Sequence, residues 1–172
     1  LNRSVPNSDA QPDLAVTDVS APTTVGAGDE VAVEVTVTNV GGDIRAASTW
    51  KDGAWLSKSP TYSLAATEIG VKQHTGPLAA GASYTVTLTG PARAFEQGGH
   101  SIIVRTDLAQ QVTEPDETDN ATTRGIVLTV PTLTPGGPAV HVQVATGASR
   151  LVRIPATAGR TVSITATPAT AN

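Results

Sequence analysis

The chain has 172 residues, of which 39% are hydrophobic but only 3% aromatic, and its formal net charge is −4. It has no cysteine, which excludes a disulfide framework and thiol chemistry, and no apolar run near the roughly 20 residues that membrane insertion requires. The four Lys/Arg residues beyond residue 120 are scattered and lack interleaved aromatic residues, so no nucleic-acid partner is expected.

Residues 1–12 are polar, contain two prolines and are predicted to be a linker. The first strand is expected to start at Asp13 and to end at Ala21-Pro22. The clearest strand is 30–39, where valines alternate with other residues and so fall on one face. These valines are Val31, Val33, Val35 and Val37.

Residues 50–57 allow two interpretations. Asp52-Gly53 is typical of a tight hairpin, but such a turn would leave three residues on each side, too few to pair well. We therefore favour a single strand in which Trp55 lies on one face. The residues on the other face would be Trp50, Asp52, Ala54 and Leu56.

Turns rich in glycine and proline separate the remaining strands, which are predicted at about 67–74, 82–89, 100–106 and 122–130. The pattern shows no helical periodicity. Seven or so short strands between turn signals predict an all-β fold, an immunoglobulin-like seven-stranded β-sandwich over residues 13–130.

Residues 131–138 are predicted to be a second linker. Beyond it, residues 139–172 contain three strand-like segments, at 140–145, 150–154 and 161–165. So short a unit rarely folds alone, and three strands leave two unpaired edges. We expect this incomplete β-rich segment to be the start of a second domain, docked on the sandwich or on another chain.

Five segments occur in the order typical of one family. They are Pro12-Asp-Leu-Ala-Val-Thr17, Val35-Thr-Val-Thr-Asn-Val-Gly41, Trp50-x-Asp52-x-x-Trp55-Leu-Ser57, Gly76-Pro-Leu-Ala-Ala-Gly-Ala-Ser-Tyr84, and Thr106-Asp107 leading to Val112-x-Glu114-x-x-Glu117-x-x-Asn120. Residues 12–122 thereby resemble CARDB, the cell-adhesion-related domain found in bacteria. The resemblance implies a seven-stranded sandwich, often repeated in tandem in large secreted or surface proteins, and it implies no reaction. The family usually has Asn where this chain has Asp116 and Asp119.

The loop at 107–120 carries five acidic residues and no Lys or Arg. Crowded carboxylates repel one another unless solvent, backbone N–H groups or a cation stabilises them. One interpretation is a Ca²⁺ site, since Ca²⁺ accepts many oxygen ligands in irregular geometry. Its candidate ligands are Asp107, Glu114, Asp116, Asp119 and Asn120. In the alternative, Asp116, Asp119 and Asn120 cap the turn and Glu117 is a buried acceptor.

Catalytic motifs are absent from the sequence. His74, His100 and His141 lack the spacing of a zinc site, and neither a nucleophile elbow nor a phosphate-binding glycine loop occurs. Trp55 is a candidate for stacking on a sugar, although in a chain with so few aromatic residues at least one tryptophan is expected in the core.

Two functions remain open. The first is a non-catalytic extracellular structural or adhesion module of a larger secreted or surface bacterial protein, acting as a spacer between neighbouring domains of the same polypeptide, with a cell-surface protein or glycan as a further partner. The alternative is a glycan- or protein-binding accessory module of a secreted hydrolase. An exposed Trp55 would favour the alternative, and a buried Trp55 would favour the spacer.

Overall fold

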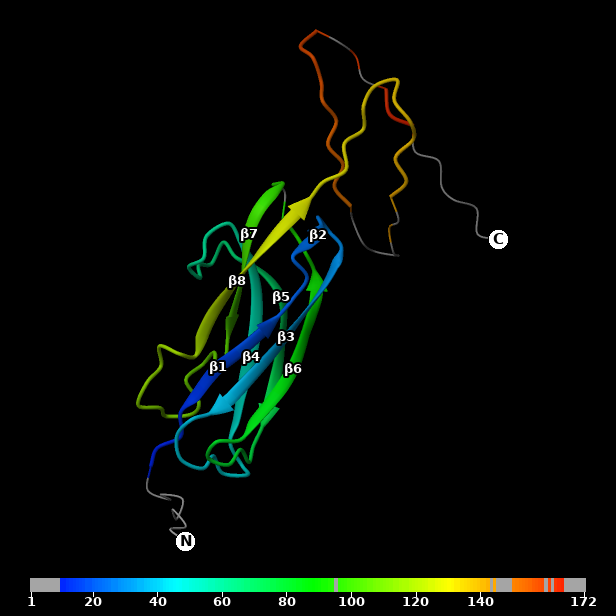
Figure 1. Ribbon diagram of the computed structural model, residues 1–172. Helices are drawn as coiled ribbons and strands as arrows, with labels where there is room; N and C mark the ends of the chain where they lie inside the picture. The colour runs from blue at the N-terminus through cyan, green and yellow to red at the C-terminus, as the bar shows by residue number, and fades with distance from the viewer. Residues whose placement is uncertain are drawn as a thin grey trace, which may run out of the picture.

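The computed structural model describes residues 10–94, 96–142, 144, 150–159, 161 and 163–165. Within them the chain forms two facing β-sheets and no helix (Figure 1). The strands are β1 (Leu14–Ser20), β2 (Thr24–Gly26), β3 (Glu30–Asn39), β4 (Thr49–Ser57), β5 (Thr67–Thr75), β6 (Ser83–Pro91), β7 (Gly98–Arg105) and β8 (Ala121–Thr129). One sheet has the order β1-β3-β6 and the other β2-β8-β7-β4-β5. The predicted all-β sandwich is therefore confirmed.

The core between the sheets is aliphatic, as the composition predicts. The four alternating valines of β3 are at most 1% exposed, and they form one cluster with Leu88 of β6 and with Ile102 and Val104 of β7. Burial of this branched apolar surface is the main favourable term in folding. In the described part of the chain, no helix has the length and apolarity to cross a membrane.

The single-strand interpretation of residues 50–57 is confirmed. β4 pairs antiparallel with β5 on one side and with β7 on the other, with a bulge between Ala54 and Trp55 on the β5 side. Because β4 has a strand on each side and cover on both faces, its residues from Asp52 to Ser57 are all buried. Trp50 lies in the core cluster, whereas Trp55 points to the outer face.

One strand more than predicted is present, because the first strand changes sheets. β1 ends at Ser20, and after Pro22 the short strand β2 joins the other sheet, parallel to β8. Proline has no N–H to donate to a strand ladder, which explains the interruption. The side chain of Arg124 on β8 spans the two sheets by donating from Nη1 to the carbonyl oxygen of Val19, at 2.9 Å.

The chain enters and leaves the sandwich at opposite ends. Leu14, where β1 begins, pairs with Asn39 at the far end of β3, whereas β8 ends at Thr129 beside Gly26, just before β3 begins. β3 itself spans about 30 Å at the usual rise of a strand. Figure 1 shows the same arrangement, with the N-terminal side of β1 at the bottom and the segment after β8 at the top.

Beyond β8 the structure differs from the prediction. The described parts of 140–145, 150–154 and 161–165 form no strand. In this part of the chain, Thr132 and Arg153 form an isolated parallel β-bridge, which is made by two backbone hydrogen bonds. Isolated segments without neighbouring strands gain too few ladder bonds to offset the ordering cost. Residues 1–9 of the first predicted linker, and residues 143, 145–149, 160, 162 and 166–172 of the tail, lie outside the described residues.

Candidate functional site

Asp107 organises the acidic loop through its carboxylate. Its Oδ1 accepts the backbone N–H of Gln111 and its Oδ2 accepts that of Val112, both at 2.8 Å. The residue is buried and has a φ of 41°, a left-handed conformation that Asp tolerates better than most residues. Both carboxylate oxygens are therefore occupied by the loop's own backbone.

Glu114 attaches the loop to the first strand. Its Oε1 accepts the N–H of Leu14 at 2.5 Å, and its Oε2 accepts Nδ2 of Asn120 at 2.6 Å. Burial raises the pKa of Glu114 to about 7, with smaller contributions from the negative charges of Asp107 and Glu117, while the two hydrogen bonds act in the opposite direction. Glu117 also accepts from Asn120, at 3.1 Å. Glu117, which was expected to be a buried acceptor, is only half-buried, and Glu114 accepts from the same side chain of Asn120.

The five residues predicted to bind calcium do not converge on one point. Asp116 lies at the surface, where its Oδ1 accepts both the N–H and the hydroxyl of Thr118, which lowers its pKa. The oxygens of Asp107 and Glu114 are directed at N–H groups. Within the described residues, no three His, Cys, Asp or Glu side chains form a group that could hold a metal ion. Backbone N–H groups thus occupy oxygens of Asp107 and Glu114 that the predicted five-ligand calcium site would use.

Two of the predicted residues nevertheless present oxygens without a hydrogen-bond donor. Oδ1 of Asp119 and Oδ1 of Asn120 are buried and unpartnered, and so is Oδ1 of Asp13, at the entry to β1. The Asp119 carbonyl oxygen accepts the N–H of Val16, so this part of the loop lies against β1. Burial and then the charges of Asp13 and Asp116 raise the pKa of Asp119. Burying acceptor oxygens costs free energy unless a hydrogen-bond donor or a cation pairs with them.

Trp55, the candidate for sugar stacking, is buried, with 7% of its surface exposed. Its ring meets the edge of Tyr62 at a centroid distance of 5.1 Å, and the guanidinium of Arg105 lies 5.1 Å from the Tyr62 ring centroid. The indole also lies close to Gly53, where a Cβ atom would collide with it. The face that a sugar would need is therefore covered by the chain itself, as in a small packed cluster.

A buried polar network inside the sandwich was not predicted. Nε1 of Trp50 donates to the hydroxyl of Tyr84 (2.7 Å), which donates to Oδ2 of Asp52 (2.8 Å), while Thr106 donates to Oδ1 of Asp52 (2.6 Å). Asp52 is 1% exposed, and burial raises its pKa despite these hydrogen bonds. The alternation of β4 did place Asp52 on the same face as Trp50, which was the available signal.

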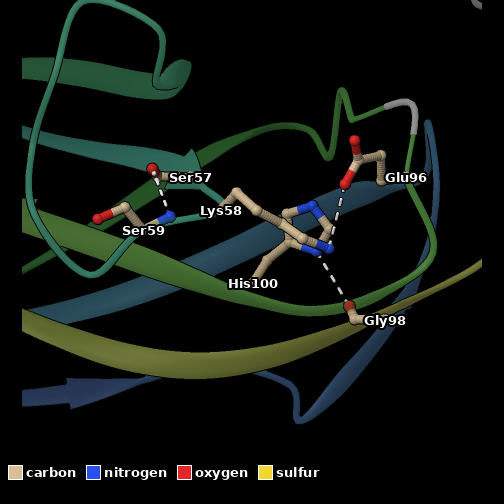
Figure 2. Close-up of polar contacts among 6 residues, drawn as sticks. All are labelled: Ser57, Lys58, Ser59, Glu96, Gly98 and His100. Carbon is tan, nitrogen blue, oxygen red and sulfur yellow. Dashed lines mark hydrogen bonds and ion pairs between the residues drawn. The ribbon is translucent and has the colours of Figure 1, made fainter.

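The three histidines have local roles. His74 stacks on Tyr84, with centroids 3.7 Å apart, and burial lowers its pKa. Nδ1 of His100 lies 2.9 Å from the carbonyl oxygen of Gly98. Figure 2 draws this contact and the exposed ion pair between Lys58 and Glu96. His141 is exposed in the segment after β8. Each histidine thus stands in a different part of the molecule.

Comparisons with known proteins agree with this geometry. Residues 11–124 match the family model CARDB. A CARDB domain from Pyrococcus furiosus, solved in complex with di-metal ions, is 25% identical; the match covers 69% of this chain and 90% of that one, with a TM-score of 0.50. A domain assigned to a cell surface protein of Methanosarcina acetivorans is 17% identical over 69% of this chain and 93% of that one, with a TM-score of 0.52, and shows the fold alone. No curated protein matches the chain.

Proposed function

The chain belongs to the CARDB family, and we propose that it is a non-catalytic spacer of a larger secreted or surface protein, which holds neighbouring domains apart. The observation that carries this proposal is the position of the two ends. The polypeptide enters beside Asn39 and leaves beside Gly26, at opposite ends of β3. A module threaded in this way adds a fixed length of about 30 Å to a chain of domains.

The burial of Trp55 supports the spacer over the glycan-binding alternative. Sugar recognition commonly uses an exposed aromatic face, and this indole is buried, with Tyr62 and Gly53 in contact with it. The family is associated with cell-surface proteins, which supports an exported location. A spacer needs a rigid core and defined ends, and the aliphatic sandwich supplies both.

The spacing can be measured with spin labels, because the chain has no cysteine of its own. We expect cysteines introduced at the exposed positions Gln11 and Thr129 to give one narrow distance distribution of at least about 30 Å. In parallel, a glycan array probed with the wild type and with Trp55→Ala should show no binding by either protein. A broad distance distribution, or saccharide binding that Trp55→Ala loses, would contradict the spacer.

A second proposal concerns the acidic loop, where calcium would be held by Asp13, Asp119 and Asn120. Support comes from their buried oxygens, which face no donor, and from the mutual repulsion of Asp13 and Asp119. Oxygen-only ligands suit Ca²⁺, and the related Pyrococcus domain was solved with metal ions. An ion there would join the entry of β1 to the loop before β8 and stiffen that end.

Millimolar Ca²⁺ is expected to raise the melting temperature and EDTA to lower it. At a Ca²⁺ concentration 100 times the Kd, binding adds about 2.7 kcal/mol to the free energy of unfolding. Asp119→Asn should abolish the shift, whereas Asp116→Asn should retain it, because Asp116 lies at the surface and bonds to Thr118. A wild-type melting temperature that does not respond to Ca²⁺ would rule out the site.

A further inference from the structure

We propose that Asp29 and Arg150 form a latch that fixes the orientation of the segment after β8 relative to the sandwich. Oδ1 of Asp29 forms an ion pair with Nη2 of Arg150, across the junction between the two parts of the chain. This inference rests on the spacer function and adds to it. The segment after β8 would hold one orientation relative to the sandwich and would not rotate freely.

The carboxylate of Asp29 is held in place by a tight turn. The N–H of Asp29 donates to the carbonyl oxygen of Gly26 at 2.8 Å, and Asp29 and Ala92 are joined by a backbone hydrogen bond of 2.7 Å. Gly28 has a φ of 87°, a conformation that favours glycine. The Asp29 carboxylate lies where a Cβ atom of residue 26 would stand, so glycine at that position makes room for it.

Arg150 lies in the segment after β8, which leaves the sandwich and then returns to it. The N–H of Arg153 donates to the carbonyl oxygen of Pro131, and the N–H of Leu133 donates to that of Arg153, both at 2.8 Å. The side chain of Leu151 packs against the sandwich core. Residue 150 is thereby brought to the β2–β3 turn, about twenty residues after β8 ends.

The ion pair has a large influence on the orientation of the segment after β8, because the side chains around it are loosely packed. A cavity of about 320 Å³ lies between the turn and the returning segment, lined by Gly26, Thr129, His141 and Leu151, among others. Among the described residues, two backbone hydrogen bonds and the packing of Leu151 set the position of the segment, and neither fixes its tilt. The Arg150 side chain is 21% exposed and the Asp29 side chain 45%, and the planar guanidinium restricts the approach of the carboxylate.

The test measures orientation directly in the full chain. Cysteines introduced at Thr87 on β6 and at Thr157 in the tail, both exposed, carry spin labels for pulsed distance measurement. We expect one narrow distribution in the otherwise wild-type protein and its loss in Asp29→Asn and in Arg150→Gln. The double variant should be no broader than Arg150→Gln alone, since both substitutions remove the same ion pair between Asp29 and Arg150. Arg153→Gln is the matched control, because it removes the same charge three residues away and leaves the narrow distribution intact.

Each other outcome has a definite meaning. A narrow distribution in both neutralised variants would overturn the latch, because Leu151 and the backbone bridge would then suffice. A broad distribution in the wild type would also overturn it. If the Gln11–Thr129 distance stays narrow in that case, the latch fails while the spacer stands. A broad Gln11–Thr129 distribution would instead count against the spacer itself.

Discussion

Replacing Asn39 with alanine is expected to lower the free energy of unfolding by about 3 to 5 kcal/mol. Asn39 is fully buried at the end of β3 and uses all of its hydrogen-bonding capacity. Its Nδ2 donates to the carbonyl oxygens of Gly42 (2.6 Å) and Leu78 (3.1 Å), and its Oδ1 accepts the N–H groups of Asp13 and Gly41, both at 3.1 Å. Alanine would leave four backbone groups without these partners.

Urea unfolding followed by tryptophan fluorescence measures this loss. Thr38→Ala is the control, since the neighbouring hydroxyl bonds to Thr17 and Ser83 at the exposed surface and its removal should cost less than about 1 kcal/mol. Asn39→Asp keeps the acceptor but loses both donated bonds, so we expect it to be nearly as damaging as alanine. A loss below about 1 kcal/mol for Asn39→Ala would instead show that water replaces the hydrogen bonds of the Asn39 side chain.

Strand positions could be predicted because they depend on local patterns. The alternating valines of 30–39 define β3 to the residue, and the choice of one strand over a hairpin at 50–57 is confirmed. β2 was missed because it has only three residues and is stabilised by pairing with β8, about a hundred residues away. The segments beyond residue 139 have strand-like composition, but composition alone does not supply a neighbouring strand.

The candidate site was harder to predict because its geometry depends on long-range contacts. A run of carboxylates in sequence says where negative charge accumulates, but not which oxygens the backbone will use. Asp107 bonds to N–H groups four and five residues ahead, whereas Glu114 bonds to Leu14, one hundred residues back. Asp13 joins the unpartnered oxygens only because β1 lies beside the loop. Likewise, the cover over Trp55 comes from Tyr62, beyond the end of its strand.

The second large effect is expected for Tyr84→Phe, which should lower the free energy of unfolding by about 2 to 4 kcal/mol at pH 7. The variant removes one oxygen atom and leaves two buried groups without partners. These are Nε1 of Trp50 and Oδ2 of Asp52, which the hydroxyl joins at 2.7 and 2.8 Å. Thr106 would remain on the other carboxylate oxygen, so Asp52 would keep part of its stabilisation.

Tyr62→Phe is the matched control, because it deletes the same atom from the other tyrosine. The Tyr62 ring packs on Trp55, and its hydroxyl makes no hydrogen bond within the described part of the chain. We expect its cost to stay within about 0.5 kcal/mol. The double variant Trp50→Phe/Tyr84→Phe should lose less than the sum of its single variants, since each breaks the same hydrogen bond.

The deficit of Tyr84→Phe should also grow with pH. Burial raises the pKa of Asp52 above its unfolded value, so between those two values the folded protein holds more protons and its stability falls as pH rises. The hydrogen bond from Tyr84 opposes that shift, and its removal raises the pKa of Asp52 further and widens the window. Unfolding measured at increasing pH, starting from the ordinary Asp value of 3.8, should therefore show wild type and variant diverging as the pH rises. A deficit that stays constant over this range would mean that the hydroxyl supports packing alone and not the buried charge.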